Sequence, residues 1–279
     1  MMSLTVNSIP FRWNEKTYIM GILNVTPDSF SDGGQYNTIE KAVEQAIQME
    51  KAGADMIDIG GESARPNHNP ISPEEEINRV IPMIRAVKES VDIPISIDTY
   101  KAETAEIAIQ AGAQMINDIW GARKDLEMAS VATKYRVPII LMHNREHKNY
   151  INLIDEVVED LHTSVSIVKK AGVEDEQIIL DPGIGFGKTL EHNFQVMNRL
   201  DEIIAEFDYP FLLGASRKSF ISKVLDIPAE KRDNATGATT CLGVVKGVNI
   251  VRVHDVERTV ELTKMMDAML FKGVANNET

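Results

Sequence analysis

A short apolar run that ends in a polar residue, followed by an amphipathic stretch, recurs eight times along this chain. Apolar runs without alternating polar residues are typical of strands buried on both faces of a parallel sheet. The expected strands cover residues 18–24, 56–61, 94–99, 115–120, 138–144, 178–183, 210–216 and 249–255. Eight strand–helix pairs favour a closed (β/α)8 TIM barrel over an open doubly wound α/β sheet, which remains the alternative at this stage.

The stretches between these runs are predicted to be helices. They cover residues 39–52, 73–90, 101–111, 125–135, 151–171, 190–206, 236–246 and 257–275. The second begins with strong signals, because Ser72 is a suitable N-cap, Pro73 suits the first helical position and three glutamates follow. We find no linker or shift in composition, so we expect residues 1–279 to form one barrel domain.

Charge and cysteine content exclude several classes of protein. The chain has 29 Lys+Arg and 42 Asp+Glu, a net charge of −13, which argues against a non-specific nucleic-acid binder. The single cysteine, Cys241, excludes an internal disulfide and a multi-cysteine zinc site, and it fits a reducing compartment such as the cytoplasm. Residues 1–12 lack a secretory signal pattern, and no apolar run is long enough to span a membrane.

Polar residues stand at or near the end of every expected strand. In a (β/α)8 barrel these ends meet at one mouth, where catalytic groups lie. Each residue could instead cap a helix or pin a loop, but their convergence favours a ligand site. The residues are Asn24, Asp58, Glu62, Asp98, Asn117, His143, Asp181, Lys218, Arg252 and His254.

The residue types indicate the chemistry of the ligand. Asp98, Asn117 and Asp181 are mainly acceptors, which suits a heterocycle that presents N–H and NH₂ groups, and Lys218 adds a donor. A second group suits an anion. It comprises Arg65, Arg252 and His254, with Asn24 as an oxygen ligand for Mg²⁺. A planar, amino-bearing heterocycle with a phosphate tail satisfies both groups.

Three loops near the expected strand ends contain further candidate site residues. Residues 24–34, which include Phe30, and residues 62–70, which include Arg65, are candidate lids. Residues 181–189 do not form a phosphate-binding P-loop, since Pro182 stands where the first glycine is required. We expect this segment to hold Asp181 over the ligand.

His143 is expected to be a hydrogen-bonded structural residue. A hydrolase is disfavoured, because no serine lies in a G-x-S-x-G elbow.

Seven segments together resemble the dihydropteroate synthase family. They are GILNVTPDSFSDGG at 21–34, DIGGESARP at 58–66, SIDT at 96–99, NDI at 117–119, DPGIGFG at 181–187, SRKSF at 216–220 and RVHD at 252–255. The resemblance implies a cytoplasmic, homodimeric single-domain barrel of folate biosynthesis and a sulfonamide target. It also implies a transferase that condenses 6-hydroxymethyl-7,8-dihydropterin diphosphate with p-aminobenzoate, giving 7,8-dihydropteroate and pyrophosphate.

The resemblance assigns roles by motif position. The expected pterin residues are Asp98, Asn117, Asp181, Lys218 and Arg252, and the expected diphosphate residues are Asn24 with Mg²⁺, Arg65, Arg252 and His254. The expected p-aminobenzoate residues are Phe30, Pro66, Phe186, Lys218 and Ser219, and the expected catalytic group is Asp98, Lys218, Arg252 and His254. Two positions depart from the family pattern: Ala64 replaces the usual Thr or Ser, and Asn67 replaces a common Gly.

The expected reaction is an SN1-like displacement in which Asp98 stabilises positive charge on the pterin methylene. Two other functions remain open from the sequence. One is a related barrel that transfers a methyl group from a folate to a corrinoid partner, which would share the pterin acceptors but would not need Arg65, His254 or the loop after Asn24. The other is a non-catalytic pterin sensor, which would bind pterin without consuming it.

Overall fold

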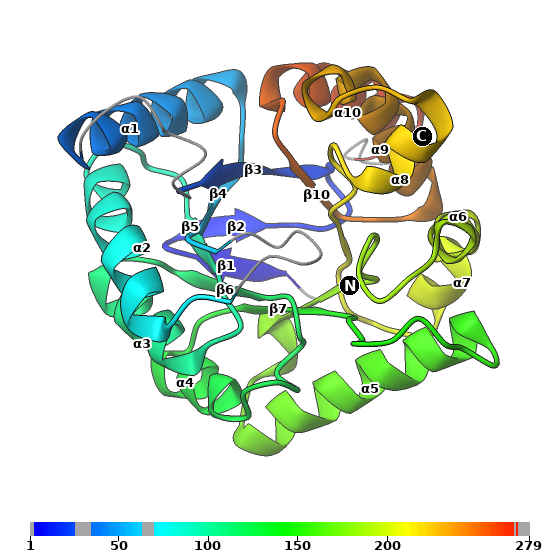
Figure 1. Cartoon of the computed structure of the whole chain (residues 1–279), viewed down its shortest axis with the longest axis horizontal. Coiled ribbons are helices and arrows are strands. Elements are labelled where there is room, and N and C mark those ends of the chain that lie inside the picture. Colours follow the sequence, from blue (N-terminus) through cyan, green and yellow to red (C-terminus); the bar gives the residue numbers. More distant parts are fainter. Residues whose placement is uncertain (1–2, 26–34, 63–69, 271, 273–279) are drawn as a thin grey trace, which may run out of the picture.

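The computed structural model describes residues 3–25, 35–62, 70–270 and 272. Its main sheet contains eight parallel strands in the order β8-β7-β6-β5-β4-β3-β10-β9. They are β3 (Tyr18–Asn24), β4 (Met56–Gly60), β5 (Ile95–Asp98), β6 (Met115–Asp118), β7 (Ile139–Met142), β8 (Ile178–Asp181), β9 (Leu212–Leu213) and β10 (Ile250–Val253). A parallel bridge between Leu180 and Phe211 joins the two ends of this order, so the sheet closes. The expected (β/α)8 barrel is confirmed (Figure 1).

Helices surround the strands as a continuous outer layer (Figure 1). They are α1 (Gln35–Ala52), α2 (Pro73–Lys88), α3 (Ala102–Ala111), α4 (Glu127–Tyr135), α5 (Leu153–Ala171), α6 (Leu190–Asn198), α7 (Leu200–Ala205), α8 (Ser219–Leu225), α9 (Asp233–Lys246) and α10 (Val256–Met269), with 3-10 turns η2 (Asp175–Gln177) and η3 (Ala229–Lys231). Ser72 caps α2 as expected, with its hydroxyl accepting from the backbone N–H of Glu75 at 3.2 Å. No helix in the described ranges is long and apolar enough to cross a bilayer.

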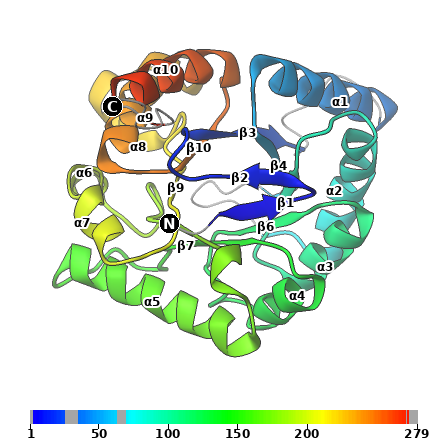
Figure 2. The same cartoon turned by 180° about the vertical axis from the view of Figure 1, so that it is seen from behind.

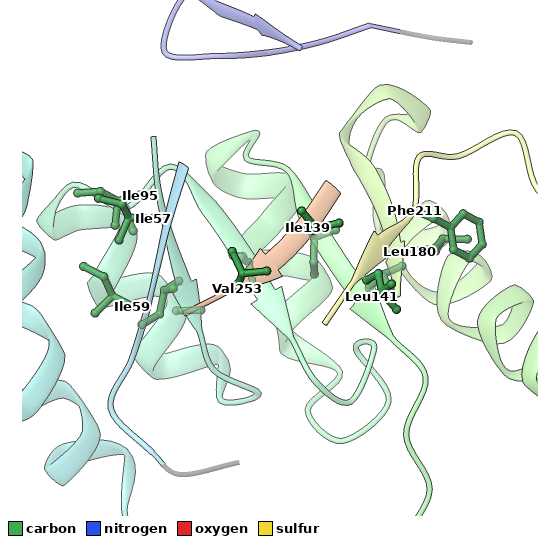
Figure 3. Close-up of a cluster of buried hydrophobic side chains, with 14 of the residues drawn as sticks. Ile57, Ile59, Ile95, Ile139, Leu141, Leu180, Phe211 and Val253 are labelled. Carbon is green, nitrogen blue, oxygen red and sulfur yellow. The ribbon is translucent and has the colours of Figure 1, made fainter. Parts of the chain in front are cut away.

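Alternate side chains along each strand divide the core into two clusters. Outward-facing residues pack between the strands and the helices, and Figure 3 shows several of them, including Ile57, Ile59, Ile139 and Leu141. Inward-facing residues fill the lower half of the barrel. They are Tyr18, Met20, Met56, Met115, Ile140, Ile179, Leu212 and Ile250, and we call them the barrel floor.

A hairpin that the sequence analysis missed closes the barrel beneath this floor. Strands β1 (Leu4–Val6) and β2 (Ile9–Phe11) pair antiparallel and lie across the centre of the barrel in Figure 2. Leu4, Val6 and Phe11 belong to the same buried cluster as the floor residues. The bottom of the barrel is therefore sealed by apolar packing, which leaves the opposite end as the mouth.

Several predicted boundaries were wrong. The helix expected over 190–206 is two helices, because Arg199 leaves the helical conformation (φ −109°, ψ 25°), and α7 then buries Leu200 and Ile203. The strand expected over 210–216 is only two residues long. The short helix α8 was not anticipated, and α10 ends at Met269 rather than continuing to 275.

Candidate active site

The barrel mouth is lined by polar residues that stand two positions after floor residues on the same strands. Asp58 follows Met56, Asn117 follows Met115, Asp181 follows Ile179 and Arg252 follows Ile250. Because side chains alternate along a strand, the same pleat that points the floor residues inward points these polar groups inward one layer higher. Ser96 and Asp98 share this alternation on β5, where Asp98 pairs with Asn117 of β6.

Arg252 lies at the centre of a buried ionic cluster. Its Nε donates to Asp58 Oδ2 at 2.6 Å, and its Nη2 donates to Asp98 Oδ2 at 2.7 Å. The side-chain amide of Asn117 donates to the same Asp58 oxygen at 2.9 Å. Asn117 therefore uses its N–H₂ group within the protein, and its carbonyl oxygen is left as the acceptor for a ligand. Four strands contribute to this one cluster.

Asp181 and Lys218 form a second part of the mouth. Asp181 accepts from the backbone N–H of Gly183 at 2.7 Å, and the ammonium of Lys218 donates to the carbonyl of Ile184. A methyl group placed on Gly214 would lie 3.6 Å from Asp181 Oδ2 and 3.8 Å from Lys218 Nζ. Gly214 therefore lies directly beside both charged groups, and its lack of a side chain leaves space next to them.

Burial shifts the protonation equilibria of these groups. It raises the pKa of Asp98, an effect that Arg252 opposes and Asp58 reinforces. Burial also raises the pKa of Asp181, against the influence of Lys218. For Lys218 the same burial lowers the pKa to about 8, with Asp181 acting in the opposite direction. Acids and bases with perturbed pKa values gathered in one place are typical of a catalytic centre.

The remaining predicted residues lie around this mouth where they are described. His254 follows β10, and its Nδ1 lies 2.9 Å from Ser216 Oγ. Asn24 ends β3, the strand next to β10, opposite Gly60. The ring of Phe186 lies with its centroid 4.5 Å from Lys218 Nζ. Ser219 is exposed at the first turn of α8. Phe30, Arg65 and Pro66 lie outside the described residues, as do Ala64 and Asn67.

Two residues of the mouth were not assigned a role from the sequence. Asp58 was noted only as a polar strand end, although its single Oδ2 atom joins Asn117 and Arg252. Gly214 was given no role in the site. Its signal was present, because a glycine within an apolar strand often marks a close approach by a ligand.

A magnesium ion bound through substrate fits the donor set of this mouth. Within the described ranges no three His, Cys, Asp or Glu side chains form a group that could hold a metal by themselves. Asn24 therefore offers one protein oxygen near the mouth rather than a complete cage. Mg²⁺ commonly takes one or two protein oxygens and fills its other positions with water and substrate phosphates.

Comparison with known proteins agrees with this geometry. Residues 20–254 match the family described as pterin binding enzyme. A dihydropteroate synthase from Bacillus subtilis is 56% identical over 261 residues, which cover 94% of this chain and 91% of that protein. The crystal structure of dihydropteroate synthase from Clostridium difficile in the presence of pteroic acid superposes with a TM-score of 0.91 at 50% identity, covering 93% of this chain and 98% of the other.

A more distant solved structure shows the same relationship. The Yersinia pestis dihydropteroate synthase, in a complex with a sulfonamide drug, superposes with a TM-score of 0.89 at 36% identity and covers 97% of this chain and 99% of the other. The fold, the polar mouth and these similarities agree over almost the whole chain. The chain belongs to the dihydropteroate synthase family of transferases.

Proposed function

We propose that the barrel mouth condenses 6-hydroxymethyl-7,8-dihydropterin diphosphate with p-aminobenzoate to give 7,8-dihydropteroate and pyrophosphate. The observation that carries this proposal is the buried cluster of Asp58, Asp98, Asn117 and Arg252, because it places acceptors for a flat aminoheterocycle beside a cation. Its relative from Clostridium difficile was crystallised with pteroic acid, a molecule that contains both the pterin and the p-aminobenzoate parts.

The pterin ring would lie between the two parts of the mouth. Asp98, Asn117 and Asp181 would accept its N–H groups, and Lys218 would donate to its carbonyl or ring nitrogen. Arg252 would stack on the ring face while keeping its bonds to both carboxylates. Asn117 suits its role because Asp58 already orients its amide.

The diphosphate would lie over the ends of β3 and β10. Arg252 and His254 lie on β10 and directly after it, and Arg65 would join them from the loop after β4. Asn24 would hold Mg²⁺, and the ion would supply positive charge that offsets the negative charge of the leaving group. Phe186, Lys218 and Ser219 would frame the p-aminobenzoate pocket, with Phe30 and Pro66 from the two loops.

The chemistry requires no enzyme nucleophile. The bond between the pterin methylene carbon and the diphosphate oxygen breaks, and its electron pair leaves with pyrophosphate. Positive charge then develops on the methylene and spreads into the pterin ring, where the Asp98 carboxylate stabilises it. The lone pair of the amine nitrogen forms the new C–N bond, and that nitrogen releases one proton to solvent water. Asp98 must be ionised for this role.

We also propose a cellular location, an assembly and an inhibitor-binding site for this enzyme. We propose that the enzyme lies in the cytoplasm, which suits a chain with one cysteine.

We propose that α9 and α10, which pack together, form a homodimer interface. Each helix exposes a large apolar side chain: Val245 on α9 is 56% exposed, and Met265 on α10 is 60% exposed. A sulfonamide, which the Yersinia pestis relative binds, would occupy the p-aminobenzoate pocket.

A coupled pyrophosphate-release assay tests the proposed reaction. The purified chain would receive the pterin diphosphate and Mg²⁺, with and without p-aminobenzoate, and dihydropteroate would be measured by mass spectrometry. We expect pyrophosphate release that depends on the amine and matches dihydropteroate one for one. Pterin binding without release would instead indicate a sensor or a methyl-transfer barrel.

A further inference from the structure

One buried cation near the mouth has no role in the proposed reaction. Lys188 lies in the loop between β8 and α6 and is only 3% exposed. Its Nζ lies 2.7 Å from His143 Nδ1 and donates to the carbonyl oxygens of Gly183 at 3.0 Å and Phe186 at 3.2 Å. The amino group of Lys188 therefore directs its three hydrogen-bond contacts to His143 and to the backbone of its own loop.

The two carbonyls that accept from Lys188 belong to the same short segment as the backbone groups that contact Asp181 and Lys218. The N–H of Gly183 donates to Asp181 Oδ1, and the carbonyl of the next residue, Ile184, accepts from Lys218. Phe186 places its ring against Lys218. A shift of this short segment would move an orienting partner of Asp181, a partner of Lys218 and an aromatic wall together.

His143 fixes Lys188 from the neighbouring strand. It is fully buried just after β7, and burial together with the charge of Lys188 lowers the pKa of its imidazole to about 3. A neutral ring accepts from the ammonium at Nδ1, so its proton lies on Nε2, which is 3.1 Å from Asp160 Oδ2 on α5. Arg145 Nε donates to the same oxygen at 2.6 Å. The loop is thus connected to α5 through a line of charged and polar groups.

A purely space-filling role explains this arrangement poorly. Burial is unfavourable for the charged form of Lys188 and lowers its pKa to about 7, whereas an apolar side chain would fill the same volume without that cost. The arrangement instead fixes two specific carbonyls. We propose that Lys188 and His143 are positioning residues that hold the β8–α6 loop so that Asp181 and Lys218 present the pterin-binding geometry. This inference rests on the proposed pterin role of Asp181 and Lys218.

Binding of 6-hydroxymethylpterin, measured by isothermal titration, tests the inference. Lys188→Met keeps the length of the side chain and removes all three contacts. We expect Kd to rise roughly tenfold or more, because a hydrogen bond to a charged group is lost. The matched control is Lys134→Met, which removes an exposed lysine of α4 that is paired with Glu106 of α3. It should leave Kd within about twofold of the wild type.

A second pair of variants covers the case in which Lys188→Met does not fold. His143→Gln retains an acceptor for the ammonium, and His143→Leu does not, so the Leu variant should bind pterin more weakly than the Gln variant. Hydrogen exchange followed by mass spectrometry should show faster exchange of the segment 182–187 in Lys188→Met and His143→Leu, with the rest of the barrel unchanged.

Three results would contradict either the positioning role of Lys188 or the proposed function, and they can be told apart. If Lys188→Met lowers the melting temperature but leaves pterin Kd and exchange of the loop unchanged, Lys188 is merely structural and the inference is wrong. Equal binding by His143→Gln and His143→Leu would contradict it as well. If the wild-type chain binds no pterin, the proposed function itself fails, whereas the exchange experiment still reports whether Lys188 holds the loop.

Discussion

The Asp58→Asn substitution tests whether one buried carboxylate organises the pterin site. Asp58 is fully buried, and its Oδ2 accepts from Arg252 Nε at 2.6 Å and from Asn117 Nδ2 at 2.9 Å. Its Oδ1 has no hydrogen-bond partner among the residues that the structure describes. The asparagine has the same shape but no charge, so its single oxygen must accept from both Arg252 and Asn117. Its new N–H₂ group then takes the place of Oδ1, which has no partner among the described residues, or else faces Arg252.

The magnitude follows from these contacts. A hydrogen bond to a charged group contributes about 1.5–3 kcal/mol, roughly twice the value of a neutral one. Removing the charge of Asp58 leaves only Arg252 charged in this contact, so we expect a cost of about 1 kcal/mol. The weaker hold on the Asn117 amide costs about another 1 kcal/mol, because the carbonyl is no longer fixed toward the ligand. The sum, about 2 kcal/mol, predicts that Kd for 6-hydroxymethylpterin rises about 30-fold.

Isothermal titration with 6-hydroxymethylpterin measures this loss directly. Asp92→Asn is the matched control, because it makes the same chemical change at an exposed position before β5. The control should bind like the wild type. If Asp58→Asn also binds within about twofold of the wild type while remaining folded by circular dichroism, Asp58 does not orient Asn117 and Arg252 for the ligand.

Three further predictions concern the same mouth. Arg252→Ala should weaken binding of the pterin diphosphate by about 2 kcal/mol or more, measured by titration, because a buried charge-assisted contact is lost; unchanged affinity would remove it from the site. Gly183→Ala should strongly reduce turnover, since its φ is +71° and the new methyl would lie 1.8 Å from the His143 carbonyl oxygen; wild-type turnover would contradict this steric argument. The pH profile of kcat/KM should fall on the acid side well above the ordinary pKa of an aspartate, because burial raises the pKa of Asp98 and only its ionised form stabilises the cation. It should also fall above about pH 8 as Lys218 loses its proton, and an acid limb that persists unchanged in Asp98→Asn would refute the assignment.

The barrel and the direction of its polar residues could be predicted from the sequence because both depend on local periodicity. A strand side chain points inward every second residue, so the floor at Met56 and Met115 also fixes Asp58 and Asn117. Motif positions also indicated strand ends that lie together in the structure: Asp98 and Arg252 meet in a direct ion pair although they are far apart along the chain.

Other features could not be predicted because they depend on tertiary packing. Strands β1 and β2 have three residues each, too short for a periodic pattern, and only contact with the floor makes them stable. The helix break at Arg199 is likewise set by where Leu200 and Ile203 can be buried. The line from Asp160 through His143 to Lys188 joins three segments, and its spacing in the sequence resembles no motif.

The central claim is that the Asp98 carboxylate stabilises the charge that develops when pyrophosphate leaves. The most direct measurement compares kcat with the Kd of 6-hydroxymethylpterin for the wild type and Asp98→Asn. A carboxylate about 4 Å from a developing charge contributes about 3–4 kcal/mol at a partly buried site, so kcat should fall several-hundredfold. The asparagine keeps a neutral acceptor for the pterin, so Kd should rise by only about 1 kcal/mol, or roughly fivefold. Equal losses in kcat and in pterin affinity would contradict the account, because Asp98 would then only bind the pterin.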